Sequence, residues 1–364
     1  MNSNNKKSIC IIVDCLTGGG SEKVASQLSK SFYDAKFEVS IISMRDGVDY
    51  DYKGQLYNLG EINHKFGFVK SLIKIFKLKK YYKKINADIY LDFRFKNSFL
   101  KELILHLFVI NIKKTVLTIH SHRVYNYLPQ HIIFYKFYNR AKAVVVVSEG
   151  IYEATKQLFN FSNLLYIPNF YNNDIIIKSE KPIKALNKPF VIAVGRLNNE
   201  VKQFDKLIHA YKVSKPAKNN IPLYILGDGK DKENLESIIN ENNLDNIVKI
   251  MGFKSNPYPY IKASKFLLLS SKIEGFSMVI LESLALGTPV VSFNCKSGPS
   301  EIIEHNQNGL LVKNQDFNAF TKAIDRMYSD NELYENCKRN SKSSIHKYSN
   351  DEVFKRWMKL IISP

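Results

Sequence analysis

The chain has 364 residues, about twice the usual domain length, so two domains are the first expectation. Hydrophobic residues make up 45% and charged residues 24%, a composition that excludes disorder on a large scale. The 53 Lys and Arg residues outnumber the 34 Asp and Glu residues, and the resulting net charge of +19 would attract nucleic acid, anionic lipid or phosphorylated substrates.

The pattern of cysteines and the length of the apolar runs indicate the cellular compartment of the protein. The four cysteines are scattered and form no CxxC pair, which argues against a disulfide framework or a structural zinc. The polar amino terminus contains no apolar signal-peptide core, and no run reaches the ~18 apolar residues of a spanning helix. We therefore expect a protein of the cytoplasm that has no membrane span.

Short β-branched runs alternate with longer amphipathic stretches in the first half of the chain, a pattern typical of βαβ units with a parallel sheet. Helices are predicted over Glu22–Tyr33 and Val69–Lys84. The predicted strands are Ser8–Val13, Glu38–Ser43, Asp88–Phe93, Lys114–Ile119 and Ala143–Ser148.

The second half repeats this alternation. Its predicted strands are Phe190–Gly195, Leu223–Gly227, Val248–Met251, Phe266–Ser270 and Pro289–Phe293. Its predicted helices are Gln203–Lys212, Lys230–Asn242, Met278–Leu286 and Phe317–Ser329.

This organisation predicts two Rossmann-like, doubly wound α/β domains, over residues 1–170 and 190–348, that face a cleft. Residues 171–189 contain two prolines and four lysines and are taken as the linker, about which the domains would hinge. Residues 349–364 carry apolar side chains at helical spacing and are expected to pack back on the N-terminal domain.

The strongest chemical signal is the segment from Glu274 to Ser292, EGFSMVILESLALGTPVVS. It follows a predicted strand and leads into a predicted helix, so the backbone amides of Gly275 to Val279 would open that helix. Unpaired N–H groups and the helix dipole make such a position a natural seat for a phosphate. Glu282, one turn into the helix, could accept two hydroxyls of a ribose.

The spacing of Glu274 and Glu282 resembles the EX7E motif of retaining glycosyltransferases with the GT-B fold, most closely glycosyltransferase family 4. Other segments resemble the landmarks of this family in the same order along nearly the whole chain. They are Gly18-Gly19-Gly20-Ser21-Glu22, Thr118 to His122, Val147 to Gly150, Ile167 to Asn169, Val194 to Leu197 with Lys202, Leu226 to Gly229, Met251 to Phe253 and Asn308 to Val312.

The resemblance implies a set of roles. Arg196 and Lys202 are similar to the cationic pair on the donor diphosphate, and His120 is similar to the histidine beside the transferred sugar, with His122 the weaker candidate. Together with Glu274 these form the expected catalytic set. The expected donor contacts are Gly18, Gly19, Gly20, Gly275, Phe276, Ser277, Met278, Val279 and Glu282, and the expected nucleotide-base region is Gly227, Met251, Phe253 and Lys254.

The resemblance also implies the reaction, which is transfer of a hexose or N-acetylhexosamine from a nucleotide sugar, with UDP the expected nucleotide, to a glycan acceptor. Two segments depart from the usual family pattern. The residues before Lys202 differ from those of many members, and Ser297-Gly298-Pro299-Ser300-Glu301 replaces a Gly-Gly pair, a variant similar to the subset that handles N-acetylhexosamines in bacterial surface glycans.

Three alternatives were weighed. Asp49-Tyr50-Asp51 fits the DxD motif of metal-dependent transferases but lies in a turn-rich stretch, so neither a metal nor another cofactor is expected. The loop after the first strand contains no GxGxxG, which disfavours a dinucleotide-dependent enzyme. A basic nucleic-acid-binding protein and a sugar-nucleotide epimerase of similar fold remain as alternatives, although no nucleic-acid-binding signature accompanies the charge.

The basic residues suggest where the enzyme works. A helix from Phe68 to Lys84 would carry Lys70, Lys74, Lys77 and Lys84 on one side and Leu72, Ile75, Phe76, Leu78 and Tyr82 largely on another. Cationic helices flanked by aromatic residues are typical of the membrane interface. We therefore expect a peripheral enzyme on the anionic inner face of the cytoplasmic membrane, acting on a polyprenyl-diphosphate- or lipid-linked acceptor.

Overall fold

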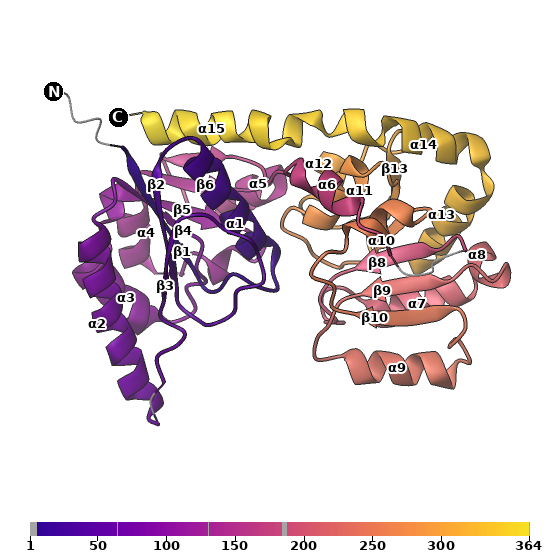
Figure 1. Cartoon of the computed structure of the whole chain (residues 1–364), viewed down its shortest axis with the longest axis horizontal. Coiled ribbons are helices and arrows are strands. Elements are labelled where there is room, and N and C mark those ends of the chain that lie inside the picture. The colour runs from indigo at the N-terminus through magenta and orange to yellow at the C-terminus, as the bar shows by residue number, and fades with distance from the viewer. Residues whose placement is uncertain (1–5, 64, 130, 184–187, 364) are drawn as a thin grey trace. The chain divides into compact units, whose positions relative to one another are not determined.

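The structure is a computed structural model that describes residues 6–63, 65–129, 131–183 and 188–363, without the side chain of Phe68. Its contacts divide the chain into two compact units, Met1–Pro168 with Phe354–Pro364 (unit 1) and Asn169–Val353 (unit 2). Each unit contains a twisted parallel sheet with helices on its faces (Figure 1). The predicted fold class, two doubly wound α/β domains, is confirmed.

Within its described residues, the sheet of unit 1 has the order β3-β2-β1-β4-β5-β6-β7, and every neighbouring pair is parallel. The predicted strands are all present, whereas β3 and β7 were not predicted. Both are short, partly exposed edge strands. β3 (QLYN) has a polar residue at each end, and the apolar run of β7 (LLY) is only three residues long. The strands are β1 (Ser8–Val13), β2 (Glu38–Ser43), β3 (Gln55–Asn58), β4 (Ile89–Asp92), β5 (Thr115–Ile119), β6 (Ala143–Val146) and β7 (Leu164–Tyr166).

The α-helices of unit 1 include α2, which covers the sheet opposite β1, β2 and β4. Leu78 and Tyr82 of α2 join the buried cluster formed by these strands, and the Tyr82 ring stacks on Tyr90 at 3.8 Å. The helices are α1 (Gly20–Asp34), α2 (Gly67–Ile85), α3 (Phe99–Phe108), α4 (Ile132–Tyr138) and α5 (Glu149–Leu158).

The second sheet has the order β10-β9-β8-β11-β12-β13 and is again parallel throughout. It matches the predicted strands and adds β13, which pairs with β12 along its whole length. Its core is one apolar cluster that joins the strands to α7, α9 and α13. The strands are β8 (Val191–Val194), β9 (Leu223–Leu226), β10 (Val248–Gly252), β11 (Leu267–Leu269), β12 (Val290–Asn294) and β13 (Gly309–Lys313).

The helices of unit 2 begin with α6, which lies within the expected linker 171–189 and packs against α10. That stretch is therefore partly helical and belongs to unit 2, and four of its residues lie outside the described part. The helices are α6 (Asp174–Ser179), α7 (Phe204–Lys212), α8 (Lys215–Lys218), α9 (Lys232–Glu241), α10 (Tyr258–Ala263), α11 (Met278–Ala285), α12 (Pro299–Ile302), α13 (Phe317–Ser329) and α14 (Asn331–Ser344).

The last helix, α15 (Asn350–Ile362), belongs to unit 1 from Phe354 onward. The Phe354 ring lies 5.0 Å from Phe32 of α1 in an edge-to-face contact. The Nζ of Lys142 donates a hydrogen bond to the carbonyl of Ser363 at 2.8 Å. The carboxyl-terminal residues thus contact α1 and the residue that precedes β6.

The division of α2 into a cationic and an apolar face was predicted wrongly. Leu72 and Phe76 are 37% and 71% exposed, whereas Lys74 turns inward and donates to the carbonyl of Met44 at 2.9 Å. The reason is helical geometry. Lys74 lies four residues before the buried Leu78 and shares its face, while Leu72 and Phe76 are rotated from Leu78 by roughly 120° and 160°.

Candidate active site

In unit 2 the predicted donor segment forms a loop and a helix start after β11. Gly275 to Ser277 lead into α11, and Ser277 is the N-cap residue, although its side chain makes no capping bond. Its hydroxyl is buried and has no hydrogen-bond partner among the described residues. Buried polar groups are nearly always paired. This hydroxyl and the first amides of α11 (Met278, Val279) are therefore suited to donate hydrogen bonds to a bound anion such as a phosphate.

The two glutamates of the motif occupy different environments. Glu282 lies within α11 and is only 4% exposed, which is unusual for a glutamate at an ordinary surface position. Glu274 precedes the helix, and its Oε1 lies 2.7 Å from the Nζ of Lys202. The side chains of this pair are 12% and 19% exposed, so the charges are largely shielded from solvent.

The backbone fixes the position of Lys202. Its amide donates to the carbonyl of Asn198 at 2.8 Å, and its own carbonyl accepts from the hydroxyl of Ser270 at 2.7 Å. Its stem runs over Gly195, where a Cβ atom would lie 3.1 Å from the Lys202 Cε. The structure thus brings together Lys202 and Glu274, which are 72 residues apart in sequence.

A glycine missed as a site residue supports the same loop from below. Gly298 has φ +92°, and a Cβ atom there would lie 3.1 Å from the Cα of Phe276 and 3.2 Å from the amide of Ser277. Only glycine allows this backbone conformation and this approach without strain. The buried Cys295 adjoins the loop, and its thiol pKa is raised to about 12 by burial and then by the Glu274 carboxylate.

The loops that follow β8, β9 and β10 stack on one another at the same edge of the sheet. The amide of Gly195 donates to Leu226, and the amide of Gly227 donates to Gly252. A Cβ atom at Gly227 would lie 1.8 Å from the carbonyl oxygen of Gly195, so no larger residue fits. The segments Val194 to Leu197 and Leu226 to Gly229, named above from the family resemblance, therefore pack directly against each other.

The remaining predicted residues of unit 2 lie on these loops. Arg196 is exposed one residue after Gly195. In the predicted base region, Met251 and Lys254 are half-buried, whereas the Phe253 ring is 51% exposed. Arg196 follows the carboxyl end of β8, and the base region lies at the carboxyl end of β10, which is where open α/β sheets bind their ligands.

In unit 1 the predicted glycine loop joins β1 to α1. Gly18 has φ +74°, and Gly19 is the N-cap of α1, which begins at Gly20. The carboxylate of Glu22 folds over Gly19, where a Cβ atom would lie 2.0 Å from its Oε2. Because this contact is to the end of a flexible side chain and Gly19 has a φ of −129°, neither space nor backbone conformation requires glycine at this position.

His120 follows β5 and is stacked on the Phe93 ring at 4.8 Å. Its ring nitrogens are buried and have no hydrogen-bond partner among the described residues. Burial, followed by the nearby charge of Lys96, lowers the pKa of His120 to about 3. The imidazole is therefore neutral at physiological pH, with one donor and one acceptor nitrogen.

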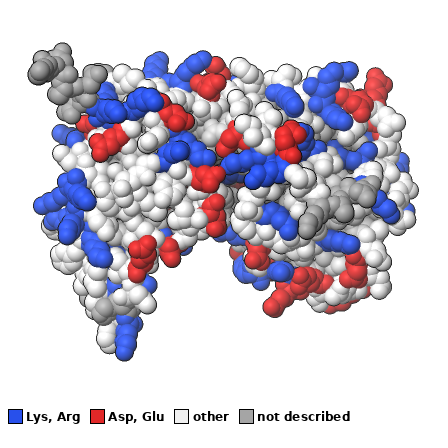
Figure 2. Space-filling view, in the orientation of Figure 1, with Lys and Arg blue, Asp and Glu red and all other residues white. Residues whose placement is uncertain are grey.

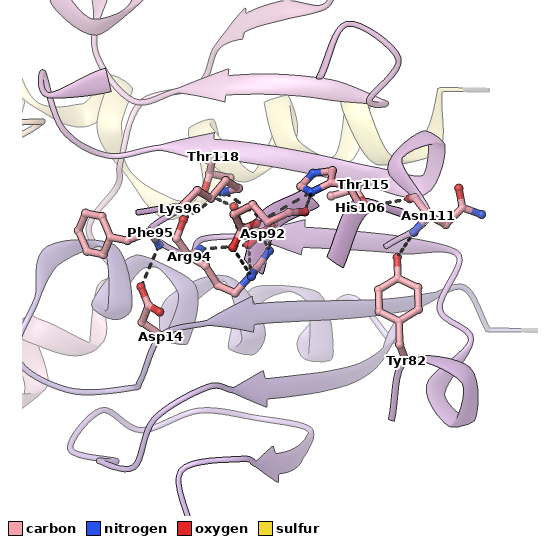
Figure 3. Close-up of polar contacts among 11 residues, drawn as sticks. Asp14, Tyr82, Asp92, Arg94, Phe95, Lys96, His106, Asn111, Thr115 and Thr118 are labelled. Carbon is pink, nitrogen blue, oxygen red and sulfur yellow. Dashed lines mark hydrogen bonds and ion pairs between the residues drawn. The ribbon is translucent and has the colours of Figure 1, made fainter. Parts of the chain in front are cut away.

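Sequence reasoning missed a buried ionic cluster centred on Asp92, toward which the side chains of Arg94 and Lys96 turn in Figure 3. The Arg94 guanidinium donates to both oxygens of Asp92, at 2.9 and 2.8 Å, and to Glu102 at 3.2 Å. The Nζ of Lys96 lies 3.6 Å from Asp92, and all four residues are about 1% exposed or less. Asp92, Arg94 and Lys96 alternate after a buried strand, so this pattern of opposite charges on one face was a usable signal.

Both aspartates of the alternative DxD motif, Asp49 and Asp51, interact with neighbouring side chains. Asp49 accepts a hydrogen bond from the Thr17 hydroxyl, and Asp51 lies 3.9 Å from the Nζ of Lys30. Across the described residues, no group of three or more His, Cys, Asp or Glu side chains is arranged to hold a metal ion. Nor does any helix in the described part of the chain have the length and apolarity to cross a bilayer.

Comparison with known families accounts for both units. Residues 18–174 match the family described as Glycosyltransferase Family 4, and residues 174–344 match Glycosyl transferases group 1. The two matches meet at residue 174 and cover both the glycine loop and the Glu274–Glu282 segment.

Two relatives align over nearly the whole chain. The N-acetylgalactosamine-N,N'-diacetylbacillosaminyl-diphospho-undecaprenol 4-alpha-N-acetylgalactosaminyltransferase of Campylobacter jejuni is 28% identical and covers 97% of this chain and 98% of its own length. The amylovoran biosynthesis glycosyltransferase AmsD of Erwinia amylovora is 24% identical, with 96% and 98% covered.

Solved structures of similar fold include a variant of Staphylococcus aureus TarM in complex with UDP, with a TM-score of 0.79, 17% identity, and 98% and 100% of the two chains covered. Anabaena HepE in complex with UDP and glucose gives 0.78, 18%, 98% and 100%. These findings favour neither a nucleic-acid-binding protein nor an epimerase. The chain belongs to the GT4-like glycosyltransferases of the GT-B fold.

Proposed function

We propose that the protein transfers a hexose or N-acetylhexosamine from a UDP-sugar to a glycan acceptor with retention of anomeric configuration. The observation that carries the proposal is the donor segment of unit 2, where a buried Glu282, an unpartnered Ser277 hydroxyl and the Lys202–Glu274 pair adjoin one helix start. The UDP bound to the TarM and HepE structures supports the choice of nucleotide.

Each residue of this segment has a role in the proposed reaction. The diphosphate lies on the amides that open α11 and on Arg196 and Lys202, which neutralise the charge that develops on the leaving group. Glu282 accepts hydrogen bonds from the ribose hydroxyls, and Phe253 lies next to the uracil base of the nucleotide. His120, as a neutral imidazole, hydrogen-bonds a hydroxyl of the transferred sugar.

The proposed chemistry is a front-face displacement. The bond between the anomeric carbon and the diphosphate oxygen breaks, and the acceptor oxygen bonds to the same face of that carbon. The proton of the acceptor hydroxyl passes to the departing diphosphate. No metal is required in this scheme, because Arg196 and Lys202 supply the positive charge.

A panel of nucleotide sugars tests the assignment. We expect UDP-sugar hydrolysis or transfer that is insensitive to EDTA. It should fall about 10²–10³-fold in Arg196→Ala, which removes a charge-stabilising contact. Glu282→Ala should also lower it, because the ribose hydroxyls lose their hydrogen-bond acceptor. Glu304→Ala, at a position outside the donor segment, is the matched control. Full activity in Arg196→Ala would remove the cationic pair from the mechanism.

We further propose a lipid-linked acceptor in bacterial surface-glycan synthesis and attachment to the inner face of the cytoplasmic membrane. The name of the Campylobacter relative specifies a diphospho-undecaprenol-linked acceptor. On α2, the exposed Leu72 and Phe76 share a face with the exposed Lys80 and Lys83. Figure 2 displays Lys and Arg side chains gathered at the α2 side of unit 1.

This exposed face of α2 suits an interfacial helix, because apolar side chains enter the headgroup boundary while each nearby lysine adds about 1 kcal/mol on an anionic leaflet. Co-sedimentation with anionic vesicles should fade in high salt and weaken in Lys80→Glu/Lys83→Glu and in Phe76→Ser. The matched charge reversal Lys338→Glu/Lys342→Glu on α14 should leave binding unchanged. Failure to co-sediment with either neutral or anionic vesicles would contradict membrane attachment.

A further inference from the structure

The imidazole of His120 is held by neighbouring rings but by no hydrogen bond to its nitrogens. It stacks on the Phe93 ring at a centroid distance of 4.8 Å and an interplanar angle of 26°, and the Tyr127 ring lies 6.2 Å away. Both ring nitrogens are buried, and neither has a hydrogen-bond partner in the described part of the chain. Stacking fixes the plane of the ring, but it does not decide which nitrogen carries the proton. A hydrogen bond to one nitrogen usually makes that choice, and the described residues offer His120 none.

A second buried histidine of unit 1 shows the usual arrangement. The Nδ1 of His106 lies 2.7 Å from the carbonyl oxygen of Glu102. A carbonyl oxygen only accepts hydrogen bonds, so the proton of a neutral His106 lies on Nδ1. Burial lowers the pKa of His106, which favours this neutral form. The backbone therefore decides the tautomer of His106, whereas another influence decides that of His120.

A positive charge is fixed in place near His120. The Nζ of Lys96 lies 3.6 Å from Asp92 and donates to the carbonyl of Arg94 at 3.1 Å (Figure 3). The backbone of the same lysine is fastened as well, because its amide donates to the carbonyl of Asn126 at 2.7 Å. Burial lowers the pKa of the Lys96 ammonium, while the Asp92 carboxylate favours its charged form. The side chain is 0% exposed, so solvent screens this charge little.

The ends of β4 and β5 bring this ammonium and the imidazole into the same part of unit 1. Asp92 pairs with Leu117 across the two strands, and the Thr118 hydroxyl donates to the carbonyl of Asp92 at 3.1 Å. Asp92, which holds Lys96, thus lies beside the strand that His120 follows. The charge of Lys96 reaches the imidazole, since it is the second cause, after burial, of the lowered pKa of His120.

A nearby cation distinguishes the two tautomers of a neutral imidazole. The nitrogen without a proton carries a lone pair and is the negative end of the ring dipole, and the N–H is the positive end. The low dielectric of a protein interior strengthens the interaction of this dipole with a charge. We propose that Lys96 selects the tautomer of His120, so that the nitrogen nearer to the ammonium carries the lone pair and the farther nitrogen carries the proton. Lys96 is then a positioning residue, which acts on the reaction through His120.

The inference rests on the proposed function, in which His120 hydrogen-bonds a hydroxyl of the transferred sugar. The tautomer decides whether the ring nitrogen at that hydroxyl donates or accepts. A molecule with the other tautomer loses this contact or has to rearrange it. The expected cost is that of one hydrogen bond, a roughly two- to tenfold lower kcat/KM.

Imidazole ¹⁵N NMR of the whole protein, without donor, reads the tautomer directly, and His120→Gln assigns the signals of His120. The wild-type protein should give one protonated and one unprotonated nitrogen for this ring. Lys96→Met removes the ammonium and keeps an unbranched side chain. The two ¹⁵N shifts of His120 should then move toward each other as the tautomers mix, and kcat/KM for a UDP-sugar should fall roughly two- to tenfold.

Two controls separate selection of the tautomer from loss of packing. His106 is observed in the same spectrum, and its tautomer should stay single in Lys96→Met because its Nδ1 remains bonded to the backbone. The double variant Asp92→Asn/Lys96→Met removes one charge of each sign, so the ionic cluster keeps a formal charge of zero. It should show the same mixing at His120, and it replaces Lys96→Met if that variant does not fold.

The outcomes separate this inference from the proposed function. Averaged ¹⁵N shifts for His120 in the wild-type protein overturn the inference, because no tautomer is then selected. Unchanged shifts of His120 in the folded variant also overturn it, even if UDP-sugar turnover is normal. Mixing that appears equally at His106 overturns it as well, since unit 1 has then loosened as a whole. Absence of UDP-sugar turnover in the wild-type protein refutes the proposed function instead, while the spectrum still decides the role of Lys96.

Discussion

The Lys202–Glu274 pair offers the sharpest perturbation, because it joins two loops of the donor segment across largely buried surface. Lys202→Met keeps the stem that packs over Gly195 but removes the cation 2.7 Å from the Glu274 carboxylate. With side chains only 19% and 12% exposed, loss of one partner should destabilise unit 2 by about 2 kcal/mol, below the 3–5 kcal/mol of a fully buried pair.

A double-mutant cycle of Lys202→Met and Glu274→Gln, followed by urea denaturation, measures the coupling, which we expect at about 1–2 kcal/mol. The surface pair Lys230–Glu200, 2.9 Å apart with side chains 57% and 69% exposed, is the matched control and should give no measurable coupling. Both Lys202→Met and Glu274→Gln should also lower kcat/KM about 10²–10³-fold. Coupling no larger than in the control pair, together with unchanged kcat/KM, would refute the reasoning.

Three further predictions concern groups with unusual environments. The pKa of His120 is lowered to about 3, so the unfolded chain binds a proton at this residue more readily than the folded protein does. The contribution of His120 to the free energy of unfolding is therefore greatest above about pH 6.5 and falls as the pH drops toward 3. NMR should detect no titration of His120 above about pH 5. Arg94→Met leaves the buried Glu102 without its arginine and Asp92 with Lys96 alone, and it should cost about 3–5 kcal/mol in urea denaturation, whereas the exposed Arg140→Met should cost nothing measurable. Gly227→Ala places a Cβ atom 1.8 Å from the Gly195 carbonyl, so calorimetry should find weaker UDP binding as the loops separate.

The sequence predicted much of the sheet architecture because buried parallel strands are continuous apolar runs. Strands β1 and β2 begin and end at the predicted residues. The edge strand β3 was missed because it contains no such run, and β7 was missed because its apolar run is only three residues long and partly exposed. The sequence pattern predicted the helix α2 but not which of its side chains face the sheet. The angular position of each residue around the helix decides this, and not the number of lysines.

The ordered motifs predict a donor segment in unit 2, and the structure places two of its residues, Lys202 and Glu274, 2.7 Å apart. Their role toward a donor stays a prediction. Spacing alone could not reveal the support from Gly298, because its value depends on the approach of a distant loop. The buried cluster around Arg94 was missed although the alternating charges of Asp92, Arg94 and Lys96 were a usable signal. Charged residues are expected at the surface, and only the fold brings Glu102 back to neutralise this one.

The stereochemistry of transfer tests the central claim most directly. The protein, a UDP-α-sugar that it hydrolyses and an octyl glycoside that it binds should give a disaccharide whose new linkage is read from its anomeric proton coupling by NMR. A retaining transferase built on Glu274 and Glu282 predicts an α-linked product, and product formation should be lost in Glu282→Ala. A β-linked product, or an α-linked product formed equally well by Glu282→Ala, would contradict the account.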